Sequence, residues 1–310
     1  MTVAVLVLAL LLAAVNGGND VAKGVATLAG AGVTGYRTAI AWGAVTTLAG
    51  AIAAVWLGTA MTRLFSAGIL DATATPALAV AALAGAAGWV GAATLARLPV
   101  STTHALVGAL LGAGLLAAPH ALRWPVLGGK VAVPLLASAA LAYALSGLLG
   151  LGTGATAGPT LRAVVLPQPT LAGAGRRTLT ALHWASAGAV SAARGLNDTP
   201  KLAAVAGFAL LPAGVPAPAI TGAVAAAMLA GALLAGQRVT RRLGEDVIHL
   251  DDTDGLRANL TTALLVGVGA GYGLPMSTTH VSTGRSPAPP VPGWAGCTAA
   301  RCANSPSRGP

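Results

Sequence analysis

Two kinds of polar segment occur twice in a chain that is otherwise apolar. The sequence Leu-Pro-x-Ser-Thr-Thr-His appears once in each half, at nearly the same distance beyond an Asn-Asp pair, and a lysine stands three residues after each aspartate. The first set comprises Asn19, Asp20, Lys23 and Ser101–His104, and the second comprises Asn197, Asp198, Lys201 and Ser277–His280. Polar elements that recur in the same order within an apolar chain are typical of membrane transporters built from internal repeats.

The two aspartates, Asp20 and Asp198, stand inside apolar stretches, whereas nearly all other acidic residues fall in predicted loops. A charge at bilayer depth costs roughly 2.5–3.5 kcal/mol on insertion scales, so a carboxylate there indicates a function. These carboxylates predict a site for a coupling cation, either sodium or a proton, with neutral oxygens added by Asn16, Asn19 and Asn197. The alternative is that each pair lies in a short surface loop between two half-length hairpin helices.

Glycines flank both Asn-Asp pairs, as Gly17 and Gly18 in the first half and Gly195 in the second. Glycine tolerates backbone conformations that other residues avoid. We therefore expect a helix in each half that is interrupted at the Asn-Asp pair, where the unwound backbone would turn its carbonyl groups toward an ion.

The Ser-Thr-Thr-His segments are predicted to begin new helices. Pro99 and Pro275 disfavour helix in the residue before them, and serine is a favoured N-cap. A helix start combines free N–H groups with the positive end of the helix dipole, which together attract anions. The hydroxyl residues there are candidate anion ligands, namely Ser101, Thr102, Thr103, Ser277, Thr278 and Thr279. The alternative is a plain N-cap, in which the hydroxyl groups serve only the helix.

Two further pairs of residues accompany these segments. His104 and His280 fit two roles equally, that of a proton carrier and that of a side chain that holds the helix cap. Lys23 and Lys201 could contact an anion, but their spacing favours ion pairs with Asp20 and Asp198 at i, i+3 on one helix face.

The composition excludes an ordinary soluble protein. Of 310 residues, 55% are hydrophobic and 8% are charged, against roughly 25% charged residues in soluble domains. The net charge of +10 comes from arginines between apolar segments, which is typical of loops that follow the positive-inside rule and not of nucleic-acid binding. The 42 glycines suit close helix packing in lipid. Cys297 and Cys302 support neither a disulfide framework nor a zinc site.

The apolar segments predict an all-α integral membrane protein, a polytopic helical bundle. The expected helical segments are Thr2–Val15 continued by Val21–Ala31, Thr38–Thr59, Thr75–Leu95, Ser101–Ala118, Lys130–Leu151, Thr178–Ala193 continued by Lys201–Leu211, Ala217–Ala235 and Leu256–Gly273. Thr2–Val15 lacks preceding basic residues and a cleavage site, so it is interpreted as a retained helix. We expect a first transmembrane repeat at 1–151, a cytoplasmic linker at 152–177 and an incomplete second repeat at 178–284.

The C-terminal end departs from the repeat pattern. Residues 285–310 are rich in proline and cannot form a transmembrane helix. We expect them to form a disordered tail outside the bilayer. Nothing after Gly284 corresponds to the two helices that follow the first Ser-Thr-Thr-His, so we expect the second repeat to be truncated. The alternatives are a natural truncation and, as the abrupt break after Gly284 favours, a tail translated out of frame from a longer gene. The chain as written is therefore expected to transport poorly.

The paired motifs resemble those of the inorganic phosphate transporter (PiT) family. Members carry G-x-N-D-x-x-[NK] and P-[VM]-S-T-T-H segments in each of two inverted repeats. The matching segments here are Gly17–Lys23, Pro99–His104, Gly195–Lys201 and Pro275–His280, and the resemblance extends over about residues 1–284. Lys23 and Lys201 depart from many members, which have asparagine at these positions.

This resemblance implies a function. It implies two inverted repeats and secondary symport of inorganic phosphate, free or as a metal-phosphate complex, across the cell membrane with sodium or a proton. Asp20, Asp198, Asn19 and Asn197 would belong to the coupling-ion and phosphate site, and the six hydroxyl residues would hold phosphate. No cofactor is expected beyond the coupling ion, and no phosphate-binding loop that would indicate ATP drive occurs in the sequence.

Other functions remain open at this point. Sulfate or another oxyanion could be carried on the same scaffold. An intramembrane hydrolase could use paired Asp or Ser and His residues, but duplication of the whole set favours transport. The lipid bilayer is an expected partner, and the sequence leaves open a homodimer and the identity of any metal.

The arginine-rich connections predict the orientation of the chain. Segments 152–177 and 237–254 each carry three arginines, so both are expected on the cytoplasmic side. The interrupted helix and Ala217–Ala235 supply two crossings between them. Single cysteines placed in each segment, in a background without Cys297 and Cys302, should react with impermeant reagent from the same face. Labelling from opposite faces would contradict this topology.

Overall fold

The computed structural model describes residues 1–70, 75–151, 174–244 and 252–284. Across these residues the chain is helical, with short connections and a single isolated bridge between Leu70 and Leu122. The helices of the first half are α1 (Thr2–Gly30), α2 (Tyr36–Leu57), α3 (Thr59–Arg63), α4 (Pro76–Leu95), α5 (Thr102–Ala117), α6 (Trp124–Val126) and α7 (Val133–Leu151). Those of the second half are α9 (Ala174–Leu210), α10 (Ala217–Arg242), α11 (Asp252–Gly271) and α12 (Thr278–Gly284).

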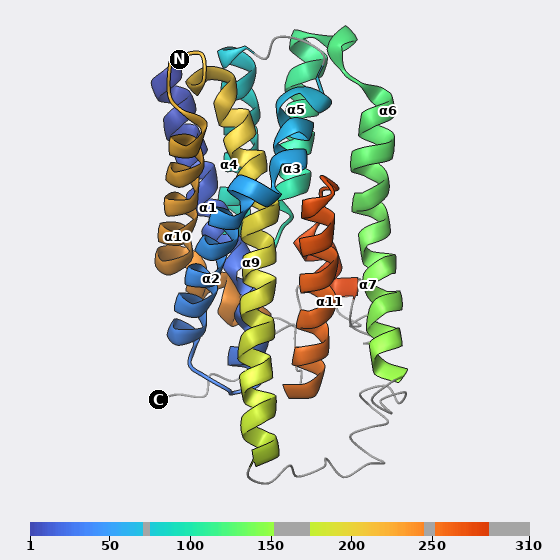
Figure 1. Cartoon of the computed structure of the whole chain (residues 1–310). Coiled ribbons are helices and arrows are strands. Elements are labelled where there is room, and N and C mark those ends of the chain that lie inside the picture. Colours follow the sequence, from blue (N-terminus) through green and yellow to red (C-terminus); the bar gives the residue numbers. More distant parts are fainter. Residues whose placement is uncertain (71–74, 152–173, 245–251, 285–310) are drawn as a thin grey trace, which may run out of the picture.

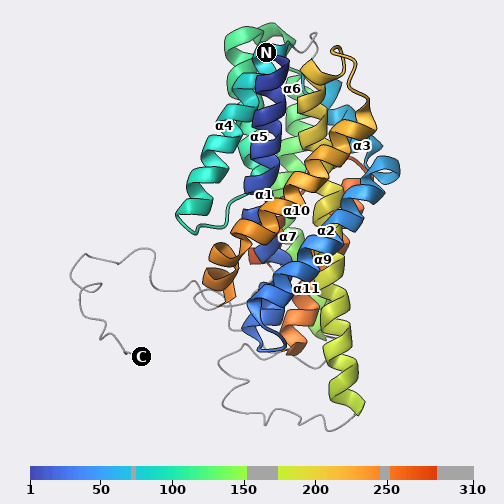
Figure 2. The ribbon, with the colours of Figure 1, turned by 90° about the vertical axis from the view of Figure 1, so that its left-hand side faces the viewer.

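The long helices form one bundle in which α1 and α9 run in opposite directions (Figure 1). Helix α1 packs most extensively against α10 and also against α4 and α9, while α9 packs against α2 and α11. Elements far apart in sequence therefore lie side by side along the bundle, and the turned view agrees (Figure 2). This arrangement brings the two Asn-Asp pairs, one on α1 and one on α9, into the same region.

Five described helical stretches are long and apolar enough to cross a membrane. They are Thr2–Gly30, Tyr36–Leu57, Pro76–Leu95, Trp124–Leu149 and Ala217–Arg242. Large apolar side chains on the outside of the bundle remain exposed, for example Trp56, Leu116 and Leu234. Lipid is the solvent that accepts such a surface, so the chain is a multi-pass helical membrane protein, as the composition predicts.

The predicted interruptions of the helices at the Asn-Asp pairs are wrong. Helix α1 is continuous from Thr2 to Gly30, and α9 is continuous from Ala174 to Leu210 with Pro200 inside it. The glycines serve close helix packing instead. A Cβ atom on Gly17 would overlap the carbonyl oxygen of Met228 in α10. One on Gly195 would overlap the carbonyl oxygen of Thr47 in α2.

Several predicted boundaries also shift. Residues 174–177, assigned to the linker, are the first turn of α9, and residues 237–242, assigned to a loop, are the last residues of α10. Residues 252–254 begin α11. Residues 152–173, 245–251 and the predicted tail 285–310 lie outside the described residues. The division into two inverted repeats and the cytoplasmic side of the connections stay predictions.

Substitution of a glycine at the contact between α1 and α10 tests whether close packing there requires glycine. Gly231 lies so close to α1 that a Cβ atom would overlap the carbonyl oxygen of Ala14, whereas Gly112 in α5 faces open space. Gly231→Val should therefore destabilise the protein by about 1–3 kcal/mol through overpacking, and Gly112→Val should not. Thermal unfolding midpoints in detergent would compare the two variants. Equal midpoints would contradict the role given to Gly231.

Candidate functional site

The two Asn-Asp pairs lie inside the bundle and not in surface loops. Asn19 and Asn197 are completely buried, and Asp20 and Asp198 are 1% and 3% exposed. Asn16 connects the two helices, because its Nδ2 donates to Oδ2 of Asp198 over 3.4 Å. The alternative interpretation of each pair as a surface loop is therefore wrong.

Each aspartate is paired with the lysine that follows it by three residues. The ammonium group of Lys23 lies 2.5 Å from Oδ1 of Asp20, and that of Lys201 lies 3.4 Å from Oδ1 of Asp198. Both lysines are 2% exposed. The predicted i, i+3 ion pairs are confirmed, and each pair belongs to a single helix, α1 or α9.

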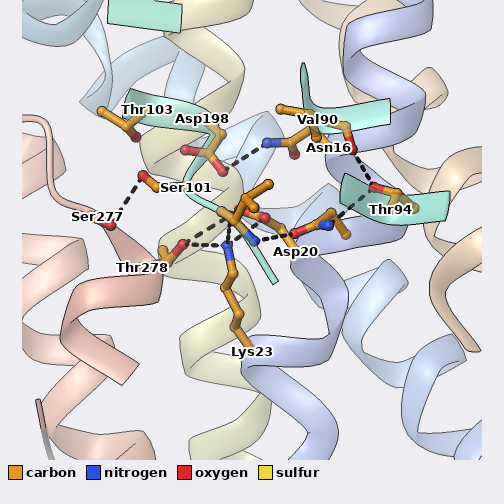
Figure 3. Close-up of polar contacts among 12 residues, drawn as sticks. Asn16, Asp20, Lys23, Val90, Thr94, Ser101, Thr103, Asp198, Ser277 and Thr278 are labelled. Atoms are coloured by element: carbon orange, nitrogen blue, oxygen red, sulfur yellow. Dashed lines mark hydrogen bonds and ion pairs between the residues drawn. The ribbon is translucent and has the colours of Figure 1, made fainter. Parts of the chain in front are cut away.

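The Ser-Thr-Thr-His segments start helices as predicted. Ser101 caps α5, where its Oγ accepts from the backbone N–H of His104 at 3.3 Å. Ser277 caps α12 in the same way, accepting from the N–H of His280 at 3.2 Å. The two serine hydroxyl groups also contact each other over 3.1 Å, so the two segments meet in space (Figure 3).

Contacts between the two halves extend from the serines to the charged pairs. The ammonium group of Lys201, on α9, donates to Oγ1 of Thr103 over 2.7 Å. Reciprocally, Lys23 on α1 lies 3.5 Å from Oγ1 of Thr278, and that hydroxyl lies 3.4 Å from Oδ2 of Asp20 (Figure 3). Each half thus supplies hydroxyl groups to the ion pair of the other half.

The asparagines of the Asn-Asp pairs form hydrogen bonds with the residues that precede the helix starts. Asn19 donates to the carbonyl oxygen of Leu98 at 2.9 Å and accepts from the N–H of Val100 at 3.0 Å. Its amide also donates to Thr94 of α4 at 3.1 Å. Asn197 donates to the carbonyl oxygen of Met276 at 3.2 Å. Asn19 therefore positions the chain before Ser101, with both ends of its amide engaged.

Three buried oxygens of this cluster have no hydrogen-bond partner within the described part of the chain. They are Asn16 Oδ1, Asn197 Oδ1 and Thr102 Oγ1. Because buried polar atoms in native proteins nearly always have partners, such atoms require an explanation, for example a ligand or ion. Of the predicted ligands, these three have atoms free to bind.

The two histidines of the motifs lie in contact, with ring centroids 4.7 Å apart and planes tilted by 53°. His104 Nδ1 lies 2.7 Å from Oγ of its own cap, Ser101. His280 Nδ1 lies 3.3 Å from the carbonyl oxygen of Leu135, in α7. His104 therefore contacts the cap, while the role of proton carrier stays a prediction for both residues.

Sequence reasoning missed Arg194 as a member of the site. Its side chain is 1% exposed, and Nη2 donates to Oγ1 of Thr47 in α2 over 2.7 Å. Within the described residues its Nε and Nη1 have no hydrogen-bond partner. The available signal was its position, since Arg194 precedes Asp198 by four residues as Asn16 precedes Asp20.

A metal site built from protein side chains is not evident in the described residues, where no group of three or more His, Cys, Asp or Glu side chains could hold an ion. The polar atoms that converge at the cluster are instead hydroxyl, amide, ammonium and carboxylate groups. This set can bind an anion through its donors and a small cation through its oxygens.

The bundle and its buried, duplicated polar cluster define a multi-pass membrane protein of the transporter class. The chain belongs to the phosphate transporter family, whose sequence pattern matches residues 16–285. The chain is similar to a Mycobacterium tuberculosis protein named "Probable low-affinity inorganic phosphate transporter", with 32% identity over 281 residues. This match covers 87% of the chain but 63% of the relative, so the chain spans less than two thirds of that relative's length.

Two further similarities concern function and fold. A Toxoplasma gondii protein named "Sodium-dependent phosphate transporter" is 38% identical over 136 residues, which are 40% of this chain and 15% of the relative. A solved structure titled "The sodium-dependent phosphate transporter" matches with a TM-score of 0.78 at 22% identity, covering 92% of this chain and 88% of the other. That structure confirms the fold. The family and its named members are transporters and not enzymes, so the hydrolase alternative is wrong.

The buried ion pair of α9 yields a prediction about stability. Lys201→Met removes the ammonium group that is paired with the buried carboxylate of Asp198, and breaking this buried ion pair should destabilise the protein by about 3–5 kcal/mol. Asp198→Asn combined with Lys201→Met removes both charges and should recover much of that loss. Lys130, which is exposed, provides the control Lys130→Met. Unfolding in detergent would rank the variants, and similar stabilities for Lys201→Met and Lys130→Met would contradict the pairing.

Proposed function

We propose that the chain carries inorganic phosphate across the cell membrane as a secondary symporter coupled to a sodium ion or a proton. The observation that supports this proposal is the convergence of hydroxyl and ammonium donors from both halves on one buried cluster, in a member of the phosphate transporter family. The named activities of the similar proteins from Mycobacterium tuberculosis and Toxoplasma gondii point to the same substrate.

Phosphate requires many donors, and the cluster offers them in a small space. Ammonium groups form strong charge-assisted hydrogen bonds with phosphate oxygens, and Lys201 already lies 2.7 Å from the hydroxyl of Thr103. The N-terminus of α5, which begins at Thr102, adds backbone N–H groups and its dipole. The proposed phosphate ligands are Ser101, Thr102, Thr103, Ser277, Thr278, Thr279, Asn19 and Asn197.

In the proposed mechanism the two halves reorient around this site. The described arrangement is closed, because the threonines Thr102, Thr103 and Thr278 are each 4–5% exposed. The hydroxyl contact between Ser101 and Ser277 joins the halves at the same place. Opening toward either side of the membrane would separate these contacts, and phosphate would then take the donors that they release.

The coupling ion is proposed to act at Asp20, Asp198 and Asn16. These residues adjoin the phosphate donors, since Thr278 lies 3.4 Å from Asp20 and Asn16 lies 3.4 Å from Asp198. A cation there offsets the charge that the carboxylates and phosphate share. The sodium dependence in the name of the Toxoplasma gondii relative supports sodium, and a proton on the same carboxylates would have the same effect.

Replacing the threonine hydroxyl groups tests the phosphate site. Thr102→Val with Thr103→Val, and separately Thr278→Val with Thr279→Val, should weaken phosphate binding, since each lost hydrogen bond to a charged group is worth about 1.5–3 kcal/mol. Thr221→Val is the matched control, because Thr221 is partly exposed on α10 and its hydroxyl group donates within that helix to the carbonyl oxygen of Ala217. Calorimetric titration with phosphate and with sulfate would measure the effect. Unchanged phosphate affinity in both double variants would leave only the N-cap role, and tighter sulfate binding would reassign the substrate.

Replacing the carboxylates tests coupling. Asp20→Asn and Asp198→Asn should each nearly abolish phosphate uptake into proteoliposomes while membrane insertion stays normal. The physical reason is that the amide carries no charge with which to hold a cation or a proton. Uptake near the wild-type rate in either variant would exclude a coupling role for that residue.

A further inference from the structure

The two buried lysines occupy the places that a coupling cation would take. We propose that the ammonium groups of Lys23 and Lys201 are the resident cations that neutralise Asp20 and Asp198, so that this protein binds phosphate without a sodium ion. This inference rests on the proposed phosphate-binding function, and of the two coupling ions proposed above it excludes sodium and keeps the proton.

The surroundings of Lys23 resemble the oxygen shell of a small cation. Its Nζ contacts three oxygens of different kinds, namely Oδ1 of Asp20 at 2.5 Å, the carbonyl oxygen of Val100 at 2.7 Å and Oγ1 of Thr278 at 3.5 Å. Hard cations prefer carboxylate, carbonyl and hydroxyl oxygens of this kind. An ammonium group has three N–H donors and no acceptor, so the number of its donors equals the number of these oxygens.

Lys201 repeats the arrangement in the other half. Its Nζ contacts Oδ1 of Asp198 at 3.4 Å and Oγ1 of Thr103 at 2.7 Å. In both halves the ammonium group therefore bridges the carboxylate to a hydroxyl residue of a Ser-Thr-Thr-His segment. A sodium ion that joined the carboxylates to these threonines would have to displace the lysine side chains.

The net charge of the buried cluster also supports phosphate binding without sodium. Among the residues whose burial is described, the buried basic side chains are Lys23, Lys201 and Arg194, and the buried acidic side chains are Asp20 and Asp198. Three positive and two negative charges leave one positive charge in excess. Arg194 stands one helical turn before Asp198 on α9, and Asn16 links Asp198 to α1, so all five side chains belong to one cluster.

This excess charge suits phosphate and disfavours sodium. A phosphate monoanion would bring the net charge of the five groups to zero, whereas an added sodium ion would raise it. Uncompensated charge is costly in a medium of low dielectric constant.

One competing arrangement remains for the test. The unpartnered oxygens Asn16 Oδ1 and Asn197 Oδ1 could ligate a sodium ion beside the lysines. In that arrangement phosphate binding would require sodium although both ion pairs stay intact.

Phosphate binding in two salts distinguishes these arrangements. Binding of radiolabelled phosphate to the purified full chain in detergent would be measured in sodium chloride and in choline chloride at the same pH and ionic strength. The dissociation constants should agree within about twofold. Binding that is about tenfold or more tighter in sodium would overturn the proposal, while the phosphate-binding function would stand. Absence of saturable phosphate binding in either salt would instead refute the proposed function.

Removing the lysines should create a need for sodium. Lys23→Asn combined with Lys201→Asn deletes both ammonium groups and leaves polar side chains in their places, so phosphate should bind at least about tenfold more tightly in sodium than in choline. Lys130→Asn makes the same chemical change at an exposed position and should behave like the wild type. Equal binding of the double variant in the two salts would overturn the role of the lysines. Because the wild-type comparison needs no substitution, it decides the proposal even where the double variant fails to fold.

Discussion

Among the residues that the structure describes, five charged side chains are buried inside an apolar helical bundle, and the rest of the site is organised around giving them partners. A buried charge without a partner destabilises a protein by several kcal/mol, and in lipid no water is available to relieve it. Asp20 and Asp198 are paired within their own helices by Lys23 and Lys201. The hydroxyl residues of the opposite half then complete the shells of these ion pairs. The duplication of the motifs thus has a physical meaning, since each half completes the polar centre of the other.

Close packing of helices makes this exchange possible. Met228 and Ala232 of α10 lie against Gly17 of α1, and Thr47 of α2 lies against Gly195 of α9, at distances that only glycine allows. Small residues let transmembrane helices approach in this way. The Asn-Asp pairs, which begin two residues after these glycines, are buried in the same region. The glycines therefore contribute to the site by bringing helices together and not by unwinding them.

A residue's structural role could be predicted from the sequence where its type favours one local structure. It could not be predicted where the type permits two. A serine two residues after a proline has one dominant consequence, so the helix starts at Ser101 and Ser277 could be predicted. A lysine three residues after a buried aspartate also has one, because the pair shares a helix face. Glycine has two, since it permits both unwinding and close contact, and only the neighbouring helix decides between them. The role of Arg194 could not be predicted because its partner, Thr47, lies on another helix.

The distribution of contacts over the two halves bears on how such a site could open. Both salt bridges are internal to one helix, Asp20 with Lys23 on α1 and Asp198 with Lys201 on α9. Besides helix packing, the polar contacts described between the halves at the site are hydrogen bonds with at most one charged partner, for example Ser101 with Ser277 and Lys201 with Thr103.

The ion pairs within a helix and the hydrogen bonds between the halves differ in strength. A hydrogen bond contributes about 0.5–1.5 kcal/mol, or about 1.5–3 kcal/mol with a charged partner, whereas breaking a buried ion pair by removing one partner costs about 3–5 kcal/mol. If the polar contacts between the halves open as in the proposed mechanism, each carboxylate keeps its ammonium group, and among the polar contacts of the site only the weaker class is lost. The donors released from that class are the hydroxyl and ammonium groups that a phosphate ion would need. The ion pairs would therefore travel with their helices, and exchange between protein and substrate would involve only the hydrogen bonds that join the halves.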